Sequence, residues 1–200
     1  GLFVIGEINS DEILDLIIKY FGEFKNSTET EDPNYKIPDF KENQFFSYKD
    51  AVQEDIVFSI WKKDIFKKHN TVENFRHAII SYLADDIYNR RLQEINETNE
   101  AAFNSAYIYE HEVSDLDVYY LHVTTLKQNS IMQGIEDSLT IAEQVNRYGF
   151  LENELELAKK RRLDYLKQAS IEETTRTSED FIEEYTDHFL FEEMISGIDK

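Results

Sequence analysis

The sequence predicts an α+β fold, a two-layer sandwich in which a mostly antiparallel sheet carries helices on one face. Short alternating or β-branched runs are interleaved with longer segments whose apolar residues recur at every third or fourth position. The composition is globular, with 41% hydrophobic and 14% aromatic residues and only 6 Gly and 2 Pro. A chain of 200 residues can bury roughly 70% of its unfolded surface. We therefore expect residues 1–200 to form a single module.

The first expected elements are a strand over residues 2–8 and a helix that follows at once. Asn9 is a favoured N-cap residue, and Glu12 stands three positions later, as in the reciprocal capping box. The helix is expected to end near Gly22. Together the two elements would be the first half of a split βαβ unit. The apolar stripe of this helix is Ile13, Leu14, Ile17, Ile18 and Phe21.

Residues 25–40 contain both prolines and predict an irregular connection. Residues 45–48 are a candidate short strand. Alternation over residues 55–62 predicts a strand, with Ile56, Phe58 and Ile60 on one face.

A second capping pair, Asn70 with Glu73, predicts a long helix that ends where residues 96–100 break the apolar pattern. Residues 103–113 and 117–127 then alternate and predict an antiparallel hairpin that turns at Ser114-Asp115. The apolar stripe of the long helix is Val72, Phe75, Ile79, Leu83, Ile87 and Leu92.

Three helices are expected to complete the chain. The first carries Ile131, Ile135, Leu139 and Ala142 at helical spacing and stops at Gly149, because glycine reaches the left-handed backbone conformation after a helix without steric cost. The other two cover residues 151–168 and 178–194. The expected order of elements is therefore β-α-β-β-α-β-β-α-α-α.

The charge balance narrows the classes of partner. The chain has 21 basic and 41 acidic residues, a net charge of −20, which would repel nucleic acid and anionic membranes. Cationic or neutral peptides are the better expectation. Cysteine is absent, so disulfide and thiolate chemistry are excluded, and the sequence leaves the compartment unknown.

Residue 1 is Gly rather than Met, and the apolar run that follows has no lead-in. We therefore expect the chain to be a fragment of a longer, multi-domain polypeptide. An apolar sheet edge, where the rest of that polypeptide would sit, is expected to be exposed and prone to self-association.

Four motifs resemble, in this order along the chain, the insulinase/pitrilysin family of zinc metallopeptidases. They lie near the first expected helix, at the end of the long helix, at the joint before the last two helices and near the C-terminus. They are Val4-Ile5-Gly6-Glu7-Ile8 with Tyr20-Phe21-Gly22; Arg91-Leu92-Gln93-Glu94-Ile95; Tyr148-Gly149-Phe150 with Glu154-Leu155 and Ala158-Lys159; and Phe189-Leu190 with Ile195-Ser196-Gly197-Ile198-Asp199.

The resemblance implies a LuxS/MPP-like α+β metallopeptidase fold and a parent enzyme whose homologous domains enclose a chamber for peptides. Such enzymes hold zinc through His-x-x-Glu-His, in which the Glu is the general base. This chain has no such motif; its histidines stand at positions 69, 77, 111, 122 and 188. We therefore assign no catalytic or metal-binding residue, leave the substrate-binding residues unknown, and expect zinc only in the parent protein.

The resemblance also implies which half of the enzyme the chain comes from. An arginine and, seven positions later, a tyrosine contact the substrate in the family's non-catalytic half; the matching positions here are Asn96 and Phe103. The chain is therefore similar to the later, non-metal-binding module of the zinc-bearing half. Its expected partners are the preceding zinc-bearing module, other domains of the polypeptide and a peptide substrate.

Other clusters have simpler interpretations. In Glu110-His111-Glu112, alternation sends His111 to the face opposite both glutamates, and the turn pairs His111 with Asp117 or Val118 rather than His122. The helical pair His188 and Glu192 could contact a cation, but a solvent-exposed pair is the more common outcome.

Two charged pairings are expected on helix surfaces. Asp86 and Arg90 are spaced for an i,i+4 pair on a solvated face, with a buried pair at a domain contact as the alternative. The basic run Lys159–Arg162 is expected to pair with Glu154 and Glu156.

The leading hypothesis is a structural, chamber-forming module of a zinc metallopeptidase that hydrolyses peptides, inactive by itself. The alternative is a zinc-free homologue that binds peptides or acts as a partner subunit. An unrelated α+β interaction domain is a third reading.

Overall fold

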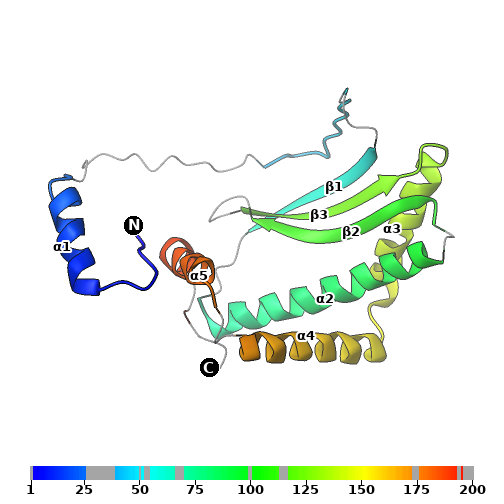
Figure 1. Ribbon diagram of the computed structural model, residues 1–200. Coiled ribbons are helices and arrows are strands. Elements are labelled where there is room, and N and C mark those ends of the chain that lie inside the picture. The colour runs from blue at the N-terminus through cyan, green and yellow to red at the C-terminus, as the bar shows by residue number, and fades with distance from the viewer. Residues whose placement is uncertain are drawn as a thin grey trace.

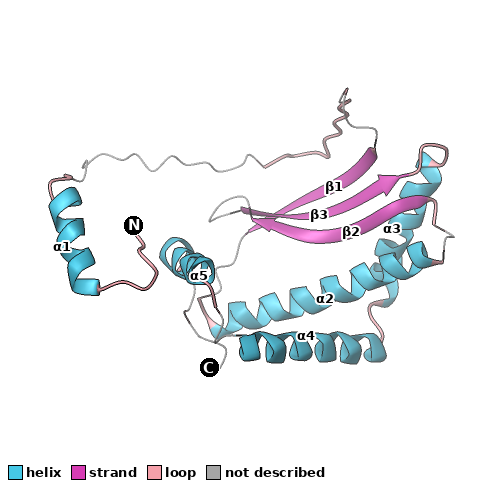
Figure 2. Ribbon diagram, viewed as in Figure 1, coloured by secondary structure: helices cyan, strands magenta, loops and turns pink. Residues whose placement is uncertain are grey.

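The structure is a computed structural model that describes residues 2–25, 39–49, 51, 55–65, 70–98, 101–112, 117–172, 176–192 and 195. Its elements in order are α1 (Ser10–Phe21), β1 (Ile56–Ile65), α2 (Val72–Glu97), β2 (Phe103–Glu112), β3 (Asp117–Leu126), α3 (Ile131–Tyr148), α4 (Glu152–Glu172) and α5 (Ser178–Phe191). Figures 1 and 2 show the three strands as one curved sheet with α2, α3 and α4 on one side of it. The predicted α+β class, with an antiparallel sheet and helices on one face, is confirmed.

The sheet has the strand order β1-β3-β2, and both ladders are antiparallel. Its strands match the three predicted over residues 55–62, 103–113 and 117–127, with β1 extended to Ile65. His111 pairs with Tyr119, one position beyond the predicted partner Val118. The last pair of residues in this ladder is Glu112 and Val118, and that register places Tyr119 opposite His111. The predicted turn at 114–115 lies outside the described residues.

The helices form two tiers under the sheet. α2 and α3 contact β2, and α3 also contacts β3, while α4 packs against α2. The core lies where these elements meet: Tyr88, Leu92 and Ile141 form a buried cluster, against which Ile108 and Phe150 pack. Apolar burial of this kind is the main favourable contribution to folding.

The predicted strand over residues 2–8 is wrong, and so is the split βαβ unit built on it. Residues 2–9 contain no strand, and residues 45–48 contain none either. A strand needs a neighbour for its backbone N–H and C=O groups, and no described strand lies beside either segment. β-branched composition alone therefore did not determine the conformation.

The helix caps are close to expectation. In α1 the Asn9 side chain accepts a hydrogen bond from the Asp11 N–H at 3.1 Å, whereas Glu12 accepts from the Asn9 side-chain amide rather than from its backbone. The N-cap of α2 is Thr71, not Asn70, because the Thr71 hydroxyl accepts from the Asn74 N–H at 3.1 Å. The last two helices are confirmed as separate elements.

Two glycines are required by the backbone of α3. Gly149 follows the helix with φ 68° and ψ −152°, a combination that residues with a Cβ rarely adopt. At Gly134 a Cβ would stand 2.6 Å from the Ala102 carbonyl oxygen, so the first turn of α3 could not approach the start of β2. The predicted stop of α3 at Gly149 and its positive φ are confirmed, but the predicted left-handed conformation is wrong, because ψ is −152°.

Candidate functional site

The described histidines are scattered over the fold. His122 is buried, with Nδ1 3.4 Å from the Tyr88 hydroxyl, and burial lowers its pKa. His111 lies in β2, where its ring is 6.4 Å from that of Tyr109. Within the described ranges, no three His, Cys, Asp or Glu side chains are grouped so that they could hold a metal ion. His69 lies outside the described residues.

The described part of the Glu110-His111-Glu112 cluster divides between the two faces of the sheet. Glu110 lies on the α2 side of the sheet. The burial of Asp85 is the larger cause of its raised pKa, and repulsion from the Glu110 carboxylate is the smaller one. His111 stands on the opposite face beside Tyr109. The predicted alternation of these two residues is confirmed, whereas the side chain of Glu112 lies outside the description.

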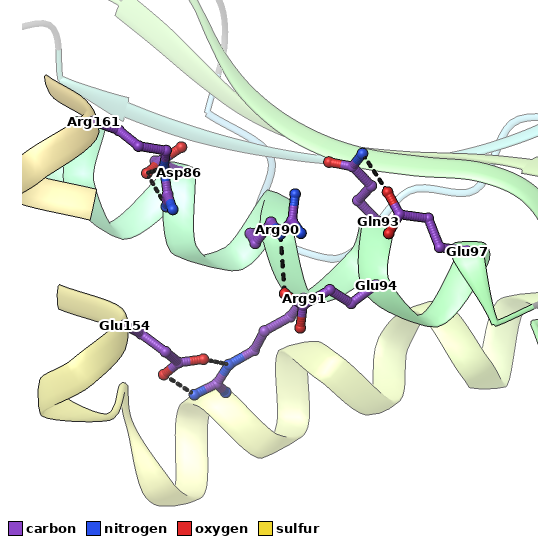
Figure 3. Close-up of polar contacts among 8 residues, drawn as sticks. All are labelled: Asp86, Arg90, Arg91, Gln93, Glu94, Glu97, Glu154 and Arg161. Atoms are coloured by element: carbon purple, nitrogen blue, oxygen red, sulfur yellow. Dashed lines mark hydrogen bonds and ion pairs between the residues drawn. The ribbon is translucent and has the colours of Figure 1, made fainter. Parts of the chain in front are cut away.

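Arg91 connects two of the sequence motifs in space. Its guanidinium donates from Nε and Nη2 to the Glu154 carboxylate, both at 2.7 Å (Figure 3). Nη2 also donates to the Gly149 carbonyl at 3.2 Å. The Glu154 carboxylate accepts a further bond from the Leu151 N–H at 2.7 Å. The hydrogen bonds from Arg91 lower the pKa of Glu154. Arg91 and Glu154 therefore fix the joint between α3 and α4 against α2.

The neighbours of Arg91 show why its motif is structural. Leu92 is fully buried in the core, and the Phe150 ring lies 5.5 Å from the Arg91 guanidinium. The glycine of the same joint supplies the carbonyl that Arg91 binds. The motif at the end of α2 and the motif of the joint between α3 and α4 thus form one contact in the structure. The sequence alone does not show that the two motifs meet.

The predicted ion pair between Asp86 and Arg90 is wrong. Asp86 accepts from Arg161 at 2.6 Å, and Arg90 pairs instead with Glu94 at 2.9 Å (Figure 3). The reason is the antiparallel packing of α4 on α2, which offers Asp86 a partner in a less exposed position than the surface of its own helix. Figure 3 also shows the exposed pair of Gln93 and Glu97.

The basic run of α4 divides among several partners. Lys159 pairs with Glu156 at 2.7 Å, as predicted, while Glu154 binds Arg91 rather than the basic run. The Arg162 guanidinium lies 4.3 Å from the centre of the Tyr82 ring. Arg161 and Arg162 therefore join α4 to α2, whereas Lys159 is exposed and pairs within α4.

A cleft lies between α2 and the sheet, and it extends from the middle of the strands near Tyr88 to the end of β1 near Phe75. It consists of two hollows of about 340 and 420 Å³, and both are lined by Asp85 and Tyr120. Burial and repulsion from Glu110 raise the pKa of Asp85 to about 6. Burial, with the acidic neighbours Glu110 and Asp64, raises that of Tyr120 to about 12. The cleft thus holds a carboxylate whose charged form is poorly solvated.

The sheet face opposite α2 and α3 is rich in aromatic side chains. Trp61 is 57% exposed, and its ring lies 5.6 Å from that of Tyr119 in an edge-to-face arrangement. Tyr107 and Tyr109 are also exposed, with ring centres 5.8 Å apart. Of the described helices, α2, α3 and α4 all lie on the other side of the sheet (Figure 2). Trp61 and Tyr119 therefore belong to this open face.

Within the described residues, no helix has both the length and the apolar character needed to cross a membrane. The comparison with curated proteins finds no match.

Solved structures share the fold over nearly the whole chain. The periplasmic protease PqqL from Escherichia coli matches 97% of this chain at 14% identity with a TM-score of 0.74, and the first half of that protease matches 97% at 14% identity with a TM-score of 0.76. A predicted insulinase family protease from Yersinia pestis matches 96% at 9% identity with a TM-score of 0.70. The chain spans 22% of the PqqL chain and 42% of each of the other two.

The sequence profile of the family described as the peptidase M16 inactive domain matches residues 2–162, from the segment before α1 into α4. This match agrees with the resemblance to insulinase-type peptidases, and the first three of the four motifs lie within it. The chain therefore belongs to the peptidase M16 inactive-domain family.

Proposed function

We propose that this chain is a non-catalytic module of a longer zinc metallopeptidase, in which it shapes the chamber that admits peptide substrates. The observation that carries the proposal is the open aromatic face of the sheet, formed by Trp61, Tyr107, Tyr109 and Tyr119. Aromatic rings offer large contact area at a small cost in conformational entropy, which suits a wall that contacts many peptides.

Among the residues that the structure describes, no group of side chains fits a zinc site. The sequence lacks His-x-x-Glu-His, and the described histidines lie on different elements. No catalytic step is therefore assigned to it. In this proposal zinc is held by another module of the same polypeptide, and the bond cleavage takes place there.

The fold neighbours support the proposal in two ways. They include proteases of which this chain spans only a part. This is consistent with a module that acts beside other modules. One further neighbour, the protease FusC, is described as a complex with ferredoxin from Arabidopsis; the chain matches it with a TM-score of 0.61 at 12% identity. A polypeptide substrate is the class that we carry over to the parent of this chain.

The test uses the full-length parent protein and a quenched-fluorescent peptide. Trp61→Ala on the open face should raise KM by about threefold to tenfold, because a ring contact is worth about 1 kcal/mol, and should change kcat little. Tyr148→Ala is the matched control, since Tyr148 is exposed at the end of α3, on the helix side of the sheet. Equal effects of the two substitutions, or no effect of either, would reject the chamber-wall role.

The alternative is a zinc-free homologue that binds peptides without cutting them. It shares the open aromatic face but not the chemistry. The two readings separate in the same assay: a zinc-saturated parent that binds the peptide and leaves it intact supports the alternative. An upstream reading frame without His-x-x-Glu-His would also favour it.

A further inference from the structure

The strand register gives the open aromatic face of the sheet an ordered layout. β1 and β2 lie on either side of the central strand β3, and Trp61 and Tyr109 are both register partners of Leu121. Leu121 is only 2% exposed, whereas Trp61 is 57% and Tyr109 40% exposed. Among the described helices, neither α1 nor α5 has an extended contact with the sheet, and α2, α3 and α4 lie on its other side (Figure 2). Two exposed rings therefore flank a buried leucine.

The rings of this face are ordered within the chain itself. The Trp61 indole donates from Nε1 to the Ser59 hydroxyl at 2.8 Å, so its polar edge has a partner. Trp61 and Tyr119 meet edge to face, with an angle of 72° between their planes. An edge-to-face contact uses one face of one ring, so the other ring faces of the pair stay available to a ligand. Rings that are already ordered lose little conformational entropy when a ligand binds.

The charges around this face favour a cation over an anion. Lys63, which lies on the same face two residues after Trp61, pairs with Asp39 at 2.9 Å, so a carboxylate offsets its positive charge. The chain as a whole has a net charge of −20. Such a charge raises the local concentration of cationic ligands and repels anionic ones.

The aromatic rings select the same class of ligand as the net charge does. The face of a Trp or Tyr ring carries negative partial charge and attracts a cation placed over it. An uncharged side chain gains contact area from the rings but no electrostatic attraction, and a carboxylate is repelled by both the rings and the net charge. Of the cationic side chains, arginine has a planar, weakly hydrated guanidinium that stacks on aromatic faces.

We propose that the open aromatic face binds an arginine side chain of the peptide substrate, so that the parent peptidase prefers cationic peptides. The guanidinium lies between the rings of Trp61 and Tyr109, and its aliphatic stem lies over Leu121. The two outer strands are about 10 Å apart, twice the spacing of neighbouring strands, which leaves room for one planar group between the rings. This inference rests on the proposed function and adds to it the chemistry of the preferred side chain.

The test measures, by fluorescence anisotropy, how tightly the full-length parent binds two labelled peptides. The peptides are identical except that one carries arginine where the other carries citrulline, its uncharged isostere. The glutamate of any His-x-x-Glu-His motif in the parent is changed to glutamine, so that peptides are bound but not cut. At about 0.3 M salt the Debye length is below about 8 Å, so the distant charges contribute little. The arginine peptide should bind about fivefold more tightly, the equivalent of about 1 kcal/mol.

Substitutions at the two flanking rings assign this preference to the open aromatic face. Trp61→Leu and Tyr109→Leu remove a ring but keep an apolar side chain, and each should reduce the arginine preference to about twofold or less. Tyr148→Leu is the matched control, since Tyr148 is an exposed tyrosine at the end of α3, on the helix side of the sheet, and it should keep the fivefold preference. The two variants lie on different strands, so a local folding defect in one would not affect the other.

The possible results separate this inference from the proposed function. Equal affinity of the wild type for the two peptides overturns the inference, and so does an arginine preference that stays unchanged in both leucine variants. If Trp61→Leu weakens the binding of both peptides equally, the face still contacts the substrate, but the preference for arginine is wrong. If neither substitution changes the affinity for either peptide, the chamber-wall role is rejected together with the inference.

Discussion

The two halves of α2 face different surroundings. The C-terminal half is packed on both sides: Leu92 is buried in the core, and Arg91 binds the joint between α3 and α4. The N-terminal half carries Phe75 at the border of an open cleft. The difference shows that one continuous helix can anchor a module at one end and present a surface for another element at its other end.

The largest effect that distinguishes the halves comes from truncating one apolar side chain in each. Leu92→Ala removes a fully buried side chain and should lower the free energy of unfolding by about 3 kcal/mol. Phe75→Ala should lower it by less than about 1 kcal/mol, since the ring is half exposed. Urea unfolding of dilute monomer measures both, and equal losses would remove the distinction.

Adjacent arginines sharpen the same comparison. Arg91→Met keeps the aliphatic stem but leaves the Glu154 carboxylate without its forked partner, at a cost of about 2 kcal/mol. Arg90→Met should cause no measurable change, because its pair with Glu94 is on the surface. Thermal unfolding of both variants checks this, and a loss in Arg90→Met as large as in Arg91→Met would contradict the structural role of the joint.

Gly149 tests the joint through the backbone. Gly149→Ala should cost about 1–2 kcal/mol, although nothing lies within 4 Å of the added Cβ, because φ is 68° and ψ −152°. Gly149→Asn should not restore stability, since asparagine favours ψ near +45° at positive φ. Recovery in the Asn variant, seen by denaturant unfolding, would show that the conformation is an ordinary left-handed one.

The pH dependence of the free energy of unfolding tests the cleft side of α2 through Asp85. Its folded pKa, about 6, is above the usual 3.8, so its protonated form favours folding below pH 4 and this stabilisation is lost as pH rises through 6. Asp85→Asn should therefore raise stability at pH 8 by about 1 kcal/mol, allowing for its partial exposure to solvent, and should give no gain at pH 4.

Its neighbour provides a control of opposite sign. Asp86→Asn should lower stability at pH 8, because Asp86 binds Arg161 at 2.6 Å. Unfolding free energies of both variants at the two pH values measure the difference. A pH-independent change in Asp85→Asn would mean that its carboxyl is not poorly solvated in the folded chain.

Local patterns predicted most of the elements. The alternation over residues 103–113 and 117–127 and the glycine at 149 gave the hairpin and the end of α3, because both depend on neighbouring residues. The strand predicted over residues 2–8 is wrong for the opposite reason. A strand exists only where another strand pairs with it, and no local pattern contains that information.

The contacts between helices could not be predicted from the sequence for a similar reason. Asp86 and Arg161 are 75 positions apart, and their pairing depends on how α4 crosses α2. Arg91 and Glu154 both stood in motifs of the family resemblance, yet only the fold showed that they bind each other. Joint membership in such motifs was the signal that could have suggested the pair.

Native-state hydrogen exchange of dilute, monomeric protein tests the difference between the halves of α2 most directly. Amides of residues 87–95 should exchange slowest, through global unfolding, whereas those of residues 72–82 should exchange faster, through local opening beside the cleft. Uniform protection along α2 would contradict the account, because both halves would then be equally covered.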